Sequence, residues 1–200
     1  MLVLSAVIGI TLIGLSGYFG RVPVFLALNG NLGHAADICF TYITQLGNGL
    51  VWIPVVLLAF RLRPACLPLV LSLVVFSTLF TQVPKNLLFS HVMRPSAVIT
   101  DPGLLHTVPG VELHQSFSFP SGHTATAFSI VFLVTACFPK RKWLAALMLV
   151  YGLAVGYSRV YLAQHFPIDV GGGIIAAIIS YYASWLMQGV FDEKRKRPSA

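Results

Sequence analysis

The sequence predicts an all-α, polytopic membrane protein, with six transmembrane helices and a functional site at their outer ends. Two observations predict this fold. Of the 200 residues, 56% are hydrophobic and only 10% are charged, whereas a soluble globular domain carries about 25% charged residues. The few charges also divide the chain into six uncharged stretches. This composition rules out a disordered chain or a coiled coil, and it argues against a soluble helical protein, because too few polar side chains remain to coat one.

Each uncharged stretch is a candidate transmembrane helix, since a bilayer core of about 30 Å needs roughly 17–25 apolar residues in a helix. Four stretches have this length, while the fourth and the fifth contain 16 uncharged residues each. These two reach full length only if flanking residues lie in the interface or in a wet cavity. In chain order the six stretches are 1–20, 38–60, 64–84, 124–139, 143–158 and 170–191.

Proline marks the ends of three of these stretches. Pro64 begins the third and Pro139 ends the fourth. Pro167 stands in the expected first turn of the sixth, where its missing N–H costs little. The segment 35–44 is expected to form a short interfacial helix. The first stretch lacks the basic start and the small-residue cleavage site of a signal peptide, so we expect a membrane anchor there.

The basic residues predict the orientation, because cytoplasmic loops carry an excess of Lys and Arg. The chain has 13 basic and 6 acidic residues, a net charge of +7. With six spans, nine of the 13 basic residues fall on the side of both termini, which we therefore place in the cytoplasm. We expect the basic tail, 192–200, to lie beside anionic lipid headgroups rather than nucleic acid. The nine residues are Arg61, Arg63, Lys140, Arg141, Lys142, Lys194, Arg195, Lys196 and Arg197.

The outer side carries a different set of ionisable residues, including five of the six histidines. Two cations, Lys85 and Arg94, follow the third stretch. A charge at membrane depth costs about 2.5–3.5 kcal/mol on insertion scales, so such residues usually face a partner or a wet cavity. For Lys85 alone, snorkelling to the interface is an equal alternative.

The fourth stretch begins with a candidate anion site. Ser121 is a plausible N-cap of this helix. The free N–H groups of a helix start, together with the helix dipole, attract anions. Gly122 allows an anion to approach the backbone closely, and His123 would stand beside it in the first turn.

A third group of polar residues joins the fifth and sixth stretches. Arg159 can make bidentate contacts with a phosphate. His165 and Asp169 are four residues apart, so they share a face if this segment is helical. A carboxylate on one imidazole nitrogen fixes the tautomer and leaves the other nitrogen free to attack. A purely structural hydrogen bond is the alternative for this pair.

Together these residues predict a site for phosphoryl transfer. Cations and backbone amides can stabilise the equatorial oxygens of a phosphoryl group, while one histidine attacks and the other protonates the leaving oxygen. Such a site needs no metal. A metal site of His106, Glu112 and His114 is an alternative. The three cysteines have no paired spacing and support neither a disulfide framework nor a zinc ribbon.

These motifs resemble those of the type 2 phosphatidic acid phosphatase (PAP2) superfamily, which also includes vanadium haloperoxidases. The family motif P-S-G-H matches Pro120–His123, and S-R-x5-H-x3-D matches Ser158–Asp169. The first family motif, K-x6-R-P, is matched by Lys85, Arg94 and Pro95, with eight residues instead of six between the two cations. Six spans with a charged outer face are also similar to the membrane-bound members.

The resemblance implies a role for each motif residue. His165 would be the nucleophile that forms a phosphohistidine, and Asp169 would orient it. His123 would protonate the leaving group and then activate water. Catalysis would use no metal and no other cofactor, and vanadate would mimic the transition state. The implied phosphate-binding residues are Lys85, Arg94, Ser121, Gly122 and Arg159.

The implied substrate is a lipid phosphate whose tail stays in the bilayer, of the undecaprenyl pyrophosphate, phosphatidylglycerol phosphate or lipid A type. We predict one domain over 1–200, with its motifs in 85–169, in a bacterial inner membrane with the site facing the periplasm.

A phosphotransferase of the same family and a non-enzymatic lipid-binding or transport protein with a vestigial site are the alternatives. The known haloperoxidases are soluble, which disfavours that activity. The sequence does not indicate an oligomeric state.

Overall fold

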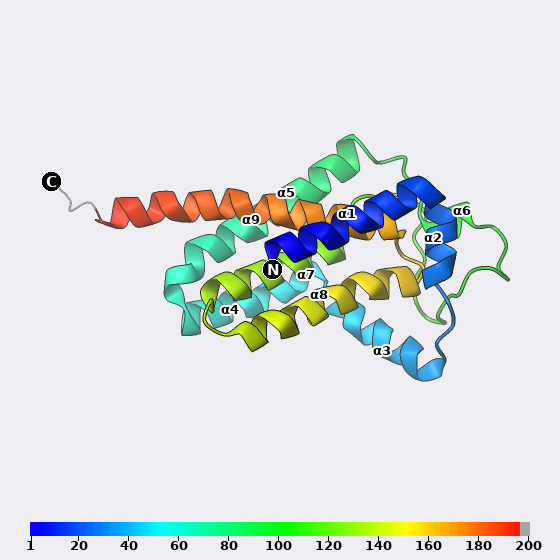
Figure 1. Ribbon diagram of the computed structural model, residues 1–200, viewed down its shortest axis with the longest axis horizontal. Helices are drawn as coiled ribbons and strands as arrows, with labels where there is room; N and C mark the ends of the chain where they lie inside the picture. Colours follow the sequence, from blue (N-terminus) through cyan, green and yellow to red (C-terminus); the bar gives the residue numbers. More distant parts are fainter. Residues whose placement is uncertain (197–200) are drawn as a thin grey trace.

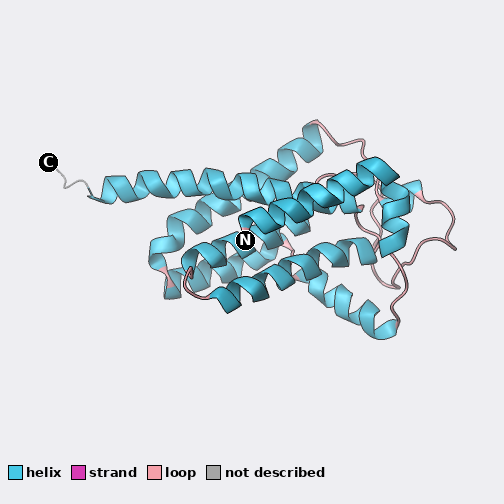
Figure 2. Cartoon of the chain, viewed as in Figure 1, coloured by secondary structure: helices cyan, strands magenta, loops and turns pink. Residues whose placement is uncertain are grey.

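The computed structural model describes residues 1–196, with the side chains of residues 1–189. Helices are the only regular secondary structure in this part of the chain, which has no strand (Figure 2), as the sequence predicts. The side chains of the predicted basic tail, 192–200, lie outside the described residues. The helices are α1 Leu2–Phe19, α2 Arg21–Leu28, α3 His34–Gln45, η1 Gly49–Val51, α4 Trp52–Leu62, η2 Pro64–Cys66, α5 Leu67–Leu87, α6 Pro95–Val98, α7 Gly122–Cys137, α8 Lys142–Tyr161 and α9 Pro167–Lys196.

Helix α9 is at the centre of the bundle. It packs along α1, α5 and α7, while α7 also packs along α8. The axes of α1, α8 and α9 are roughly aligned, and the short helices α2 and α6 lie with the longest loop at one end (Figure 1). This arrangement brings the end of α8 and the beginnings of α7 and α9 to the same end of the molecule.

A glycine run at the start of α9 permits this close packing. A Cβ atom added to Gly171 would lie 2.6 Å from the carbonyl oxygen of Gly9 in α1. A Cβ added to Gly173 would lie 2.6 Å from the carbonyl oxygen of Ser121. Real side chains do not approach backbone atoms so closely, so a larger residue at either position would displace α9 from its neighbours. The glycines therefore hold the start of α9 against the start of α7.

Four helical segments of the described chain are long and apolar enough to cross a membrane: α1, Pro64–Leu87, α8 and Pro167–Gly189. Helices α3 and α4 meet the same criteria only as a pair, bent by 58°. Helix α7 is apolar but has only 16 residues. The described part of the chain therefore has four candidate spans, or five with the bent pair, as a multi-pass membrane protein requires.

The second predicted span, 38–60, is not one straight helix. Residues 34–45 form the separate helix α3, which corresponds to the predicted short helix, and α4 begins only at Trp52. The break contains Gly47 and Gly49 on either side of Asn48, whose side chain accepts a hydrogen bond from Leu50 N at 3.0 Å and so starts a new helix. Apolar composition alone did not reveal this local competition for backbone hydrogen bonds.

Candidate functional site

The predicted site residues lie where helix ends meet. Lys85 is in the last turn of α5, Arg159 is in the last turn of α8, and Asp169 is in the first turn of α9. The backbone N–H of Ser121 donates to the carbonyl oxygen of Asp169 at 2.9 Å, which joins the starts of α7 and α9. Six of the eight predicted residues are buried, namely Lys85, Arg94, Ser121, Arg159, His165 and Asp169.

His165 and Asp169 form a buried pair. The distance from Nδ1 of His165 to Oδ2 of Asp169 is 3.4 Å, and their side chains are only 2% and 1% exposed. The same carboxylate oxygen accepts hydrogen bonds from Ser118 Oγ at 2.5 Å and from the backbone N–H of Phe166 at 2.9 Å. These bonds fix the carboxylate, and a proton on Nδ1 then leaves Nε2 of His165 with a lone pair for attack.

The surroundings of His165 keep its imidazole neutral. Burial lowers the pKa of His165 well below its ordinary value of 6.5. The positive charge of Arg94 is the next largest cause, followed by those of Arg159 and Lys85. These three cations therefore act on the histidine at close range, as expected for residues that share one site.

Gln164 holds the two guanidinium groups together. Its Oε1 accepts hydrogen bonds from Nη1 of Arg94 at 3.2 Å and from Nη2 of Arg159 at 3.3 Å. Its Nε2 donates to the carbonyl oxygen of Glu112 at 2.8 Å, which fixes the amide. A neutral amide dipole thus keeps two like charges close without neutralising them, so both remain able to bind an anion.

Arg159 has one N–H group that makes no hydrogen bond within residues 1–189. Its Nη1 donates to Thr44 Oγ1 at 2.7 Å, a contact that positions the guanidinium from α3. Its Nε is buried and has no hydrogen-bond partner within residues 1–189. A buried donor without a partner costs stability, so such an atom in a native site points to a ligand that accepts from it. A phosphate oxygen is a suitable acceptor.

The start of α7 has the predicted form of an anion site. Ser121 is the N-cap, and its Oγ accepts hydrogen bonds from Thr124 N at 3.4 Å and from Thr124 Oγ1 at 2.9 Å. The prediction of this cap is confirmed. Apart from its chain neighbours and the backbone of its own helix, no atom lies within 4 Å of the position that a Cβ of Gly122 would take. The start of α7 is therefore open beside Gly122, where an oxyanion would approach the first amides of the helix.

His123 and Gly122 both line a cavity of about 370 Å³. The cavity lies between the α3–α4 break, α5 and the first turn of α7. Its wall includes Ser77, Thr81 and Gln82 of α5 as well as Gly47 and Gly49. His123 is half-buried in this wall.

Several residues of this site were not predicted. Ser118 and Gln164 contact predicted residues directly, and Thr44 contacts Arg159 from 115 residues away. Gln164 occupies a variable position of the third motif. Ser118 lies three residues before the predicted cap. Neither position had a chemical signal of its own, because their importance depends on contacts between distant segments.

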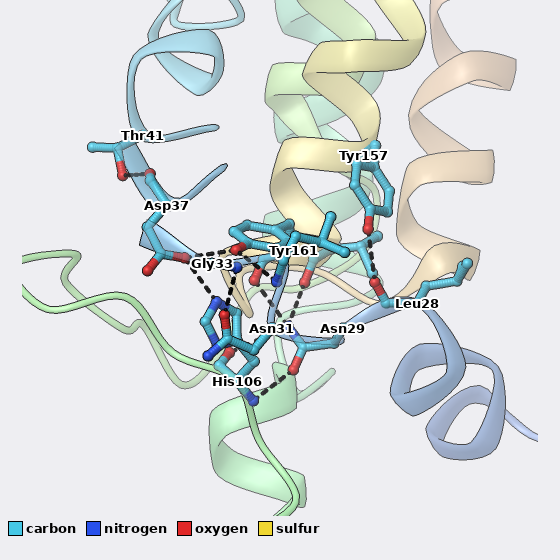
Figure 3. A network of polar contacts seen from close by, with 11 residues as sticks. Leu28, Asn29, Asn31, Gly33, Asp37, Thr41, His106, Tyr157 and Tyr161 are labelled. Carbon is cyan, nitrogen blue, oxygen red and sulfur yellow. Dashed lines mark hydrogen bonds and ion pairs between the residues drawn. The ribbon is translucent and has the colours of Figure 1, made fainter. Parts of the chain in front are cut away.

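A second polar network braces the end of α8 (Figure 3). Asp37 Oδ1 accepts a hydrogen bond from the hydroxyl of Tyr161 at 2.6 Å and lies 3.0 Å from Nε2 of His106. Asn29 Nδ2 donates to the carbonyl oxygens of Val160 and Tyr161 at 3.0 and 2.9 Å. This network ties α3 and the loop that contains His106 to the segment between Arg159 and His165, and it therefore helps to position both.

The same contacts overturn the alternative metal site. His106 pairs with Asp37 and not with the other two proposed ligands. His114 and Glu112 are exposed, and Nδ1 of His114 lies 3.7 Å from Oε1 of Glu112. Within the described chain no three His, Cys, Asp or Glu side chains are grouped as metal ligands.

Comparisons with known proteins identify relatives of this chain. A family model described as the PAP2 superfamily matches residues 65–192, which include all eight predicted site residues. Undecaprenyl-diphosphatase from Sulfolobus acidocaldarius is 31% identical over 165 residues, which are 80% of this chain and 75% of that protein.

Two solved structures are similar over most of the chain. LpxE from Aquifex aeolicus has a TM-score of 0.72 at 27% identity and covers 82% of this chain and 94% of its own. A transmembrane PAP2-type phosphatidylglycerolphosphate phosphatase from Bacillus subtilis has a TM-score of 0.67 at 25% identity and covers 99% of this chain and 98% of its own. The family model, the relative and the shared fold lead to one conclusion: this chain belongs to the PAP2 superfamily.

Proposed function

We propose that this protein is an integral-membrane lipid phosphatase that hydrolyses a phosphomonoester or a pyrophosphate on a lipid headgroup through a phosphohistidine at His165. The observation that carries this proposal is the buried pair of His165 and Asp169 beside three cations. A neutral imidazole fixed by a carboxylate is a nucleophile, and the cations supply the charge that a transferring phosphoryl group needs.

The reaction has two steps. In the first, Nε2 of His165 attacks phosphorus, and the bond from phosphorus to the leaving oxygen breaks while His123 gives that oxygen a proton. In the second, His123 takes a proton from water, the water oxygen attacks phosphorus, and inorganic phosphate leaves His165. The Gly122 amide and the Ser121 cap complete the phosphate-binding residues, and Lys85, Arg94 and Arg159 stabilise the negative charge.

For the membrane, we propose six spans in one domain over residues 1–200, with both termini in the cytoplasm of a bacterial cell and the site at the periplasmic face of the inner membrane. Helix α7 and the bent pair of α3 and α4 would complete the six. The basic residues at 61–63 and 140–142 support this orientation, because cytoplasmic loops carry an excess of Lys and Arg. The short length of α7 suits a helix whose first turn lies in a wet site rather than in lipid.

For the substrate, the relatives narrow the choice to lipid phosphates. One is an undecaprenyl-diphosphatase and another is a phosphatidylglycerolphosphate phosphatase. Each name describes an enzyme that acts on a phosphate group of a lipid. A cavity beside His123 that opens among membrane helices suits a leaving group attached to a long apolar chain.

Phosphate release from defined lipids tests the proposed function. Purified protein in detergent would receive undecaprenyl pyrophosphate, phosphatidylglycerol phosphate, phosphatidic acid or lipid A, with and without vanadate. We expect vanadate-sensitive release of inorganic phosphate from at least one lipid and little change with EDTA. Strong inhibition by EDTA that added metal reverses would contradict the proposed mechanism. No release from any lipid would favour a phosphotransferase or a vestigial site.

The role of Lys85 is a separate prediction, because its motif spacing differs from the family pattern. The substitution Lys85→Ala is expected to lower kcat/KM by about 100-fold, since it removes one of three cations that stabilise the transferring phosphoryl group. Steady-state kinetics on the best lipid substrate measure this loss. Lys142→Ala, at the other end of the bundle, is the matched control. Unchanged kinetics of Lys85→Ala would mean that another cation completes the phosphate site.

The pH dependence of kcat/KM follows from the lowered pKa of His165. Only the unprotonated imidazole can attack phosphorus, and this histidine becomes protonated only well below its ordinary pKa of 6.5. Activity should therefore persist as the pH falls through 6.5 and be lost in more acidic solution. A profile of kcat/KM, with folding checked at each pH, measures the midpoint of this loss. A midpoint at or above 6.5 would contradict a nucleophile that burial keeps neutral.

A further inference from the structure

A basic cavity lies at the end of the bundle opposite His165. It has a volume of about 390 Å³ and lies between the α4–η2 turn and the α7–α8 turn. Since the 16 residues of α7 separate it from the start of that helix, it is about 24 Å from the phosphate site. The cavity is lined by Arg63, Cys137, Phe138, Pro139, Lys140 and Arg141.

Two of the cations that line this cavity lie against one aromatic ring. The guanidinium of Arg63 lies 4.7 Å from the ring centroid of Phe138, and that of Arg141 lies 5.6 Å from it. No ion pair joins either guanidinium to a carboxylate within residues 1–189. Arg63 and Arg141 line the same cavity. Their like charges repel each other, so an anion that contacts both would stabilise this end of the bundle.

An apolar cavity of about 170 Å³ adjoins the basic one and shares Arg63, Cys137 and Phe138 with it. Its wall comes from α4, α5 and α7 and is otherwise aliphatic, including Leu58 and Leu133. The two cavities together form an amphiphilic surface, with an apolar part among the membrane helices and a cationic part at their end. A ligand that fits both parts has a hydrocarbon chain next to an anionic group.

The start of α8 adds to the attraction for an anion. This helix begins at Lys142, directly after Arg141, and no side chain caps its first amides. Uncapped amides at a helix start carry a partial positive charge. Arg141, the N-cap residue of this helix, lines the same cavity.

We propose that this cavity binds an anionic phospholipid, with the phosphodiester of the headgroup on Arg63 and Arg141 and one acyl chain in the adjoining apolar cavity. Basic pockets between transmembrane helices are known to favour such headgroups. The bound lipid joins the α4–η2 turn to the α7–α8 turn and is not turned over, because His165 is at the far end. This site does not depend on the proposed catalytic function.

Fluorescence quenching by brominated lipids tests this site without an activity assay. Trp143 is 64% exposed and lies two residues after Arg141, so a lipid bound in the cavity would quench it. The protein would be placed in phosphatidylcholine vesicles that contain brominated phosphatidylglycerol or brominated phosphatidylcholine. The signal of Trp143 is the difference between the protein and its Trp143→Phe variant. We expect phosphatidylglycerol to be preferred by about fivefold for each cation that contacts it.

Two double variants with equal loss of charge separate this site from general attraction to the membrane. Arg63→Gln with Arg141→Gln removes the two cavity guanidiniums and should bring the preference close to one. Arg61→Gln with Lys142→Gln removes two exposed cations that do not line the cavity, and most of the preference should remain. Equal quenching by both lipids in the unmodified protein, or equal losses in the two double variants, would overturn the proposal.

Discussion

Replacing His165 with alanine is expected to reduce turnover by about four to six orders of magnitude, because the substitution removes the atom that becomes phosphorylated. His165→Asn is the sharper variant, since an amide N–H can still donate to Asp169 and so preserve the carboxylate contacts at the start of α9. Phosphate release from a lipid substrate, at matched concentrations of folded protein, measures both variants.

A second histidine on the same side of the molecule supplies the control. His114 is 56% exposed in its side chain and lies on the loop between α6 and α7, so His114→Ala should keep nearly full activity. Thermal unfolding of each variant separates loss of chemistry from loss of fold. Substantial turnover by a folded His165→Asn protein would rule out this residue as the nucleophile.

Replacing His123 with alanine is expected to slow hydrolysis of a lipid phosphomonoester by about 10³–10⁴-fold, because an alkoxide leaves slowly without a proton. The loss should be much smaller for an activated aryl phosphate, whose leaving group needs no proton. The measurement is therefore a ratio of kcat/KM values for the two substrates in the unmodified and variant proteins.

This ratio distinguishes acid catalysis from simple positioning. His123 also lines the cavity beside the site, so a change of shape alone would slow both substrates alike. His34→Ala, on α3 and away from the motif residues in the sequence, serves as the control. Equal losses with both substrates for His123→Ala would show that this histidine does not protonate the leaving group.

Much of the fold was predictable because membrane helices have a simple composition. Uncharged stretches located α1, α5, α8 and α9, and Pro167 located the start of the last helix. The same method missed the break between α3 and α4. There, Asn48 and two flanking glycines end one helix and start another within an apolar run, and hydropathy does not distinguish a bent pair from a straight helix.

The site was predictable where a residue type carries chemistry and not where it only supports another residue. The cap at Ser121 and the contact of His165 with Asp169 follow from local spacing. Gln164 and Asn29 act through hydrogen bonds to residues 70 and 132 positions away. Such contacts depend on how distant segments fold together, so no local pattern could predict them.

The most direct test of the whole account is to trap the covalent intermediate. His123→Ala protein would be mixed with a ³²P-labelled lipid pyrophosphate, whose leaving group needs no proton, and quenched in alkali within one turnover. The account predicts a label that is stable to base and labile to acid, on the peptide that contains His165. No covalent label, or a label that persists when His165 is also replaced by Asn, would contradict it.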